Sequence, residues 1–209
     1  MIAAGDLTLD FIATLSRTVF GFLIGSAFGL AFGVAMGWSR LLRRSFEPML
    51  NALYVVPKLA ILPVFITIFG FGESPLIAIV AVTVFFFVWI DSMEAVASVD
   101  IGYREAAGSF GASKVDMFRH VILPASLPKI FVGLRIAIGV AILVDIAAEF
   151  VVAQSGLGFL IFNSRSLFQL EVTYAGIVFV SLLGVVMQEV IRWIGRLVTP
   201  WQSSKFLVS

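Results

Sequence analysis

The chain has no cysteine, a single histidine and few charged residues. The absence of cysteine excludes disulfide bonds, thiolate catalysis and cysteine-ligated metal sites. The one histidine has no partner carboxylate at motif spacing, so we assign no metal site. A net formal charge of +1 gives no overall basic excess that would indicate a nucleic-acid partner.

Motifs for phosphate, metal and acyl chemistry are also missing. The sequence contains no G-x-x-x-x-G-K-[ST] phosphate loop, no H-E-x-x-H and no G-x-S-x-G. We therefore predict that the chain is not an enzyme and holds no cofactor or metal of its own.

Apolar residues dominate the composition. Hydrophobic residues make up 60% of the 209 and charged residues only 13%, against about 25% charged in ordinary soluble domains. An α-helix needs roughly 20 apolar residues to cross a bilayer, whereas a membrane barrel shows short alternating segments. The sequence predicts an all-α integral membrane protein with five spanning helices, at residues 9–38, 45–69, 75–99, 128–153 and 171–200.

The basic residues fall into three clusters that these spans place on one side. They are Arg40, Arg43 and Arg44; Arg104, Lys114, Arg119 and Lys129; and Arg192, Arg196 and Lys205. The opposite side carries Glu73, Arg165 and Glu171. Because basic residues concentrate on the cytoplasmic side, we predict that the loop between the third and fourth spans and the C-terminus are cytoplasmic.

Glycine and proline mark the first two spans. Glycines recur at every fourth position from Gly21 to Gly37, which permits close approach of another helix. Packing inside the subunit is the expected use, and a homodimer interface is the alternative. Pro48, Pro57 and Pro63 predict that the second span is bent or broken, either to line a pathway or as a static kink.

Three ionisable residues lie deep in the predicted spans: Lys58, Asp145 and Glu149. Such residues are costly in hydrocarbon unless they pair or face water. Asp145 and Glu149 share one helical face, where they repel unless one is neutral or a cation such as Lys58 or Arg135 lies nearby. We predict that the three line a translocation pathway; an internal ion pair is the alternative.

The most specific pattern lies in the segment of residues 100–128. This segment is polar enough to leave the membrane, and its intermittent apolar residues are typical of short helices along the membrane surface. Gly111 is expected to form a turn, and Pro124 and Pro128 to interrupt the helix before the fourth span. Within it, Glu105-Ala106-Ala107 is followed after three residues by Gly111 and after nine more by Val121-x-Leu123-Pro124.

This spacing resembles the ATPase-docking loop of membrane subunits in ATP-binding cassette importers, where isoleucine stands in place of Val121. The resemblance assigns ATPase coupling to Arg104, Glu105, Ala106, Ala107, Gly108, Gly111, Ala112, Leu123 and Pro124. It continues through Ser16-Arg17-Thr18, Val56-Pro57 to Leu62-Pro63, Phe69-Gly70-Phe71-Gly72, and Ala148-Glu149 to Ser155-Gly156-Leu157-Gly158.

The resemblance implies a single transmembrane domain over residues 1–209, with a five-helix permease core and a cytoplasmic coupling helix. It implies a multi-pass protein of the cell inner (plasma) membrane, working with a second permease copy as a homodimer. The other implied partners are a dimer of cytoplasmic ATPases, which bind ATP and Mg, and a periplasmic or extracellular solute-binding protein. The turn at residues 154–158 and a short, partly inserted helix at 159–168 are expected to face that binding protein.

The pattern looks like the branch of permeases for nitrate, sulfonate and taurine, which also includes permeases for bicarbonate and vitamin precursors. Related subunits usually carry one more N-terminal span. Five spans with a cytoplasmic C-terminus would leave the N-terminus outside, and residues 1–10 do not resemble a secretory signal peptide that would carry it there. We therefore expect an upstream helix to be missing; a natural short form is the alternative.

Two other classes compete with this interpretation. An ATP-independent secondary transporter or channel would use Lys58, Asp145 and Glu149 as an ion relay, but it would commonly show an internal repeat, and we find no convincing one. A membrane scaffold without transport activity would leave the docking motif unexplained.

Overall fold

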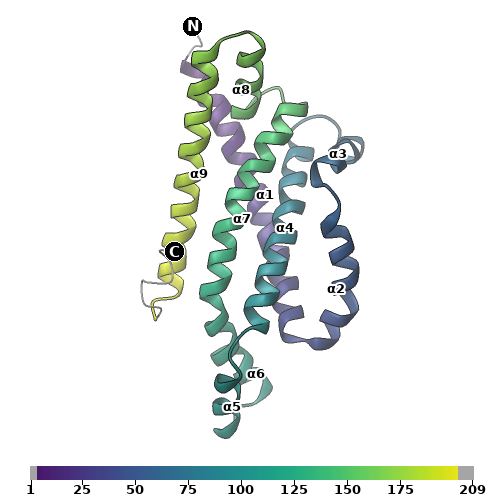
Figure 1. Ribbon diagram of the computed structural model, residues 1–209, viewed down its shortest axis with the longest axis vertical. Coiled ribbons are helices and arrows are strands. Elements are labelled where there is room, and N and C mark those ends of the chain that lie inside the picture. The colour runs from purple at the N-terminus through teal and green to yellow at the C-terminus, as the bar shows by residue number, and fades with distance from the viewer. Residues whose placement is uncertain (1–3, 202–209) are drawn as a thin grey trace.

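The computed structural model describes residues 4–201, which form helices and, in that range, no strand. Four long helices run along the long axis of the molecule (Figure 1). They are α1 (Ala4–Trp38), α4 (Glu73–Ala97), α7 (Leu123–Val152) and α9 (Leu170–Val198). Their long apolar stretches can cross a bilayer, which confirms the all-α membrane class.

A fifth span is present if a bent pair of segments is counted as one. Helix α2 (Arg40–Val55) is followed by the 3₁₀ turn η1 (Lys58–Ile61) and helix α3 (Leu62–Phe69), with a bend of 85° between them. The predicted break is therefore confirmed. It lies next to Pro57, whereas Pro48 stays inside α2 and Pro63 lies in the first turn of α3.

The glycine stripe of α1 packs against α4, as expected for contact inside the subunit. A Cβ atom built on Gly29 would lie 2.9 Å from the carbonyl oxygen of Phe85 and 2.9 Å from the Cβ of Val88. A Cβ on Gly33 would lie 2.8 Å from the Cβ of Ser92. Without side chains on this face, the two backbones approach closely and gain dispersion contacts that lipid would not replace.

The core lies where α4 packs between α1 and α7. Val80, Val84 and Val88 of α4 and Ala137 and Ala141 of α7 are almost completely buried. Helix α9 covers another side of α7 and leaves most of its own apolar surface exposed, as expected for a helix that faces lipid.

Short helices occupy the two ends of the bundle. Helix α8 (Leu157–Ser166) lies at one end, close to the start of α1, and overlaps the short helix predicted at residues 159–168, although it begins two residues earlier. Helices α5 (Ile101–Ser109) and α6 (Lys114–Asp116) project from the opposite end (Figure 1). The α1–α2 connection and the C-terminal end of α9 lie toward that same end. The predicted basic clusters therefore share one end, although Lys205 lies outside the described residues.

The prediction that Pro124 and Pro128 interrupt the helix before the fourth span is wrong. A π-helical segment, η2 (Met117–Ile122), runs directly into α7, so helix is continuous from Lys114 to Val152. Pro124 directly follows the π-helical turn, where the regular α-helical hydrogen-bond pattern is already interrupted, and Pro128 is accommodated one turn later within the helix. Helix α6 is therefore joined to α7 without an intervening loop, whereas a turn at residues 110–113 separates α5 from α6.

Candidate functional site

The first candidate site is the projecting segment, which we define as residues 100–122. Asp100 caps α5 by accepting a hydrogen bond from the Gly102 amide at 2.7 Å. Gly111 has a φ of +78°, so the turn after α5 uses the left-handed backbone that glycine adopts without strain, as predicted. Ser113 then caps the next helix by accepting from the Asp116 amide at 3.2 Å.

Few contacts hold this segment to the bundle. The Arg104 guanidinium donates to the Val96 carbonyl at the end of α4, at 3.2 Å. The rings of Phe118 and Trp38 lie 5.3 Å apart and connect η2 to the end of α1, while Ile122 is completely buried. The base of the segment is therefore anchored, and α5 extends beyond it.

The outer surface of the segment is apolar and uncovered. Ile101, Tyr103 and Val115 are more than half exposed, and Phe110 is 92% exposed. Glu105 and Ala106 are exposed beside them. Exposed apolar patches of this kind are typical of surfaces that bind a partner.

The predicted coupling residues divide into two groups. Glu105, Ala106, Gly108 and Gly111 are exposed. Arg104, Ala107, Ala112, Leu123 and Pro124 are half-buried. We infer that the first group is available to a partner, whereas the second shapes the segment and its junction with α7.

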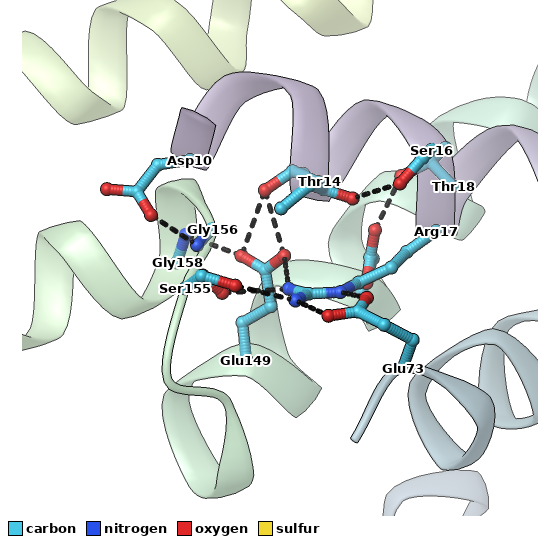
Figure 2. A network of polar contacts seen from close by, with 12 residues as sticks. Asp10, Thr14, Ser16, Arg17, Thr18, Glu73, Glu149, Ser155, Gly156 and Gly158 are labelled. Carbon is cyan, nitrogen blue, oxygen red and sulfur yellow. Dashed lines mark hydrogen bonds and ion pairs between the residues drawn. The ribbon is translucent and has the colours of Figure 1, made fainter. Parts of the chain in front are cut away.

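The second candidate site is a buried polar network at the other end of the bundle, which we call the Arg17 network (Figure 2). All five N–H groups of the Arg17 guanidinium are used. Nη1 donates to Glu149 Oε1 at 2.7 Å and to the Ser155 carbonyl at 2.8 Å. Nη2 donates to Glu73 Oε1 at 2.7 Å and to Ser155 Oγ at 2.9 Å, and Nε donates to the other Glu73 oxygen. Arg17 thus joins α1, α4, α7 and the turn before α8.

Glu149 is bound from several directions within this network. Its carboxylate accepts from Thr14 Oγ1 at 2.8 Å and from the Gly158 amide at 2.7 Å, in addition to Arg17. Asp145 lies one turn earlier and accepts from Thr18 Oγ1 at 2.7 Å. Both carboxylates are at most 1% exposed. These contacts support the internal ion pair for Glu149, while the lining role of both residues remains a prediction.

The turn at residues 154–158 is pressed against Glu149. Gly156 has a φ of +116°, and a Cβ built there would collide with the Glu149 carboxylate. A Cβ on Gly158 would lie 2.8 Å from the Cβ of Glu149. The Gly156 amide donates to Asp10 Oδ1 at 2.7 Å, and the Leu157 amide to Thr14 Oγ1 at 2.8 Å. Only glycine at 156 and 158 lets the turn close over the network.

Lys58 does not belong to this network, contrary to the suggestion that it could neutralise Asp145 or Glu149. Its ammonium instead donates to the carbonyls of Leu53, Tyr54 and Val56 at 3.0, 2.7 and 2.9 Å. It also lies 4.4 Å from the centroid of the Phe86 ring. Lys58 therefore satisfies the carbonyls freed where α2 ends, at the 85° bend.

The cation of the network was not among the residues predicted from the sequence. Arg17 is an arginine well inside the apolar first span, which by itself indicates a buried partner, yet it was noted only within the Ser16-Arg17-Thr18 resemblance. Arg135, the other cation that was considered, forms no ion pair among the residues that the structure describes. Thr14 carries no sequence signal because hydroxyl residues are common in membrane helices, while Thr18 and Ser155 appeared only within the resemblance.

Comparison with known proteins places the chain in a family. Residues 21–200 match the family described as binding-protein-dependent transport system inner membrane component. The chain is 37% identical to SsuC of Escherichia coli (strain K12), a protein named for aliphatic sulfonates transport, over 98% of the chain and 78% of SsuC. It is 34% identical to the taurine transport system permease protein TauC of the same strain, over 95% of the chain and 69% of TauC.

The fold agrees with this assignment. An inward-facing structure of the MetNI methionine ABC transporter superposes with a TM-score of 0.81 at 21% identity, covering 95% of this chain and 100% of the matched chain. None of these comparisons supports an ATP-independent carrier. The chain belongs to the binding-protein-dependent inner membrane components and is a permease subunit of an ATP-binding cassette importer.

Proposed function

We propose that this permease imports a small sulfonate and couples its transport to ATP hydrolysis in a partner through the projecting segment. The observation that carries the coupling is the exposed apolar surface around Glu105 and Phe110, at the end of the bundle. The sulfonate assignment rests on the similarity to SsuC and TauC. The partner ATPases would hold ATP and Mg, because this chain has no phosphate-binding loop.

The proposed orientation puts the projecting segment and the C-terminus in the cytoplasm. The basic clusters at that end support it, since positive residues are retained on the cytoplasmic side. The Arg17 network is then external. Two cavities of about 340 and 380 Å³ lie there, both lined by Gln154 and Ser155, and make the external end concave. We place the solute-binding protein at this end.

The proposed assembly has two copies of this permease, two ATPase subunits and one binding protein. A single type of permease is sufficient for a twofold assembly, which is the commonest symmetry of homo-oligomers. Closure of the ATPases around ATP would move the two projecting segments. Because η2 and α7 form one continuous helix, that motion would be transmitted directly into the bundle.

The coupling proposal is tested by purifying the tagged chain in mild detergent with its ATPase. Native protein is compared with Glu105→Arg in the projecting segment and with Glu171→Arg at the opposite end. Glu171 is also exposed, so it controls for the charge reversal itself. We expect the ATPase to accompany the native protein and Glu171→Arg but not Glu105→Arg. Equal recovery of ATPase with all three proteins would refute docking at Glu105.

The substrate proposal is tested by uptake of radiolabelled taurine into cells that express the chain with its ATPase and binding protein. We expect uptake that is inhibited by excess alkanesulfonate and resists excess nitrate. Inhibition by nitrate alone would exclude the sulfonate assignment without affecting the coupling proposal.

We propose that Lys58, half-buried at the bend and free of a carboxylate partner among the described residues, adds positive charge to the anion pathway. Lys58→Arg should preserve sulfonate uptake and Lys58→Gln should lower it at equal expression. Uptake that is the same in both variants would leave Lys58 as a structural cap of α2.

A further inference from the structure

An apolar groove lies between the C-terminal part of α1 and the start of α2, apart from both candidate sites. It has a volume of about 200 Å³. Its lining contains no polar side chain and consists of Ala31, Phe32, Ala35 and Met36 of α1 with Leu42 and Phe46 of α2. A groove of this composition accepts hydrocarbon and offers no group that would orient a polar solute.

The same turns of α2 that line the groove also carry a concentration of positive charge. Arg40, Arg43 and Arg44 all lie within one helical turn of Leu42. The guanidinium of Arg43 is partly neutralised by Glu47, with Nε 2.9 Å from Oε2. Arg40 and Arg44 are exposed, and neither forms an ion pair among the residues that the structure describes.

The start of α2 is unusual because its charges do not complement the helix dipole. The positive end of a helix dipole lies at the N-terminus and is normally balanced by acidic residues. The first turn of α2 has no acidic residue and begins with Arg40. An anion supplied from outside the chain would therefore be stabilised there by the arginines and by the helix terminus together.

The groove also lies at the depth where lipid headgroups are expected. It adjoins the α1–α2 connection, at the end of the bundle that carries the basic clusters. Trp38, 37% exposed, marks the same level, and tryptophan is enriched at membrane–water interfaces. A ligand here would meet hydrocarbon-compatible walls on one side and guanidinium groups at the membrane surface on the other.

We propose that this groove binds one phospholipid with an anionic headgroup, one acyl chain lying along Ala35 and Phe46 and the headgroup phosphate at Arg40 and Arg44. A zwitterionic phospholipid would fill the groove equally well but would leave the excess positive charge uncompensated. The proposal requires that the α1–α2 connection lies at a membrane surface and does not depend on the transported substrate. The bound lipid would join α1 to the beginning of the broken span.

The test is native mass spectrometry of the full-length chain in mild detergent, titrated with phosphatidylglycerol or phosphatidylcholine of identical acyl chains. We expect one phosphatidylglycerol to be retained per chain in preference to phosphatidylcholine. In the double variant Arg40→Gln with Arg44→Gln, binding of phosphatidylglycerol should weaken by roughly thirtyfold. Arg196→Gln changes an exposed arginine of α9 near the same end and should leave the binding unchanged.

A second variant tests the groove separately from the charges. Ala35→Trp fills the groove from an exposed position and should reduce retention of phosphatidylglycerol with both arginines intact. Equal retention of the two lipids, or equal losses in the double variant and Arg196→Gln, would overturn the proposal. Unchanged retention in Ala35→Trp would also overturn it, because the groove would then not be the site. If the lipid were lost when the chain forms a dimer, the groove would be covered by a second copy of the chain, and the lipid proposal would be wrong.

Discussion

At the scale of single residues, the Arg17 network shows how charge is accommodated inside this membrane protein. Arg17 and Glu149 are each 1% exposed, so neither gains much from water, and each depends on the other and on hydrogen bonds. Removing one member of a buried pair is costly because the remaining charge keeps its desolvation penalty. Replacing both members by apolar residues avoids that penalty.

We therefore predict that Arg17→Met lowers the free energy of unfolding by about 3–5 kcal/mol. The double variant Arg17→Met with Glu149→Met should recover most of that loss. The measurement is thermal or denaturant unfolding of the purified chain in detergent. Glu73→Gln provides the control, with an expected loss below about 1 kcal/mol because the Glu73 side chain is 57% exposed. If Arg17→Met unfolded at the same midpoint as the native chain, the stability of the fold would not depend on the pairing of Glu149 with Arg17.

A further prediction concerns Gly156, whose φ of +116° strains any residue with a side chain. Gly156→Ala also forces a methyl group against the Glu149 carboxylate. We therefore expect the free energy of unfolding to fall by about 1–3 kcal/mol or more. Gly108→Ala is a suitable control, because a Cβ there meets no atom within 4 Å. Similar unfolding midpoints for the two alanine variants would contradict the close packing of the turn.

At the scale of helices, the contact of α1 with α4 depends on the absence of side chains. The glycines recur every fourth residue, so they stay close to one face over more than four turns of α1. The backbone of α4 fills the space where side chains would otherwise stand. Substituting one large side chain in this stripe should separate the helices locally and disturb their neighbours.

We predict that Gly29→Leu lowers the free energy of unfolding by more than the roughly 1–3 kcal/mol that is typical of moderate overpacking. A Cβ atom at position 29 alone would already lie 2.9 Å from the Phe85 carbonyl oxygen and from the Val88 Cβ. Ala27→Leu, at an exposed position of the same helix, should have little effect. Expression level and unfolding midpoint in detergent measure the difference. If the two leucine variants behaved alike, the stripe would not be the packing surface.

At the scale of the whole molecule, the two ends of the bundle differ in charge and in exposed surface. One end carries the basic clusters and the projecting segment, and the other carries the Arg17 network and α8. This asymmetry is the physical basis of the proposed orientation, because basic residues are retained on the cytoplasmic side and so orient all the spans together. The natural lack of cysteine makes that orientation directly measurable.

Single cysteines introduced at Ser109 and Ser166 should react differently with a membrane-impermeant maleimide. Both serines are exposed, one in α5 and the other at the end of α8. In intact spheroplasts we expect labelling of Ser166→Cys, with labelling of Ser109→Cys only after the membrane is permeabilised. The native chain, which has no cysteine, is the control for background labelling. The reverse pattern would invert the proposed topology and place the projecting segment outside.

The membrane class, the approximate spans and the docking motif follow from the sequence because they depend on local composition and spacing. Helix length in hydrocarbon is set by consecutive apolar residues, and the motif is read within one segment. The break next to Pro57 and the turn at Gly111 were likewise predictable, since each arises from the backbone restrictions of one residue. The error at Pro128 arose because a membrane helix can continue through an interior proline, which a count of prolines does not reveal.

Which residues meet across the bundle was decided only by the tertiary structure. Sequence spacing placed Asp145 and Glu149 on one helical face, but their partners came from α1, more than 120 residues away, and not from Lys58. The glycine stripe allowed contact with either the same subunit or a second copy, and the approach of α4 decided between them. Local propensity and hydropathy act along the chain, whereas ion pairing and close packing depend on distances that exist only once the helices have assembled.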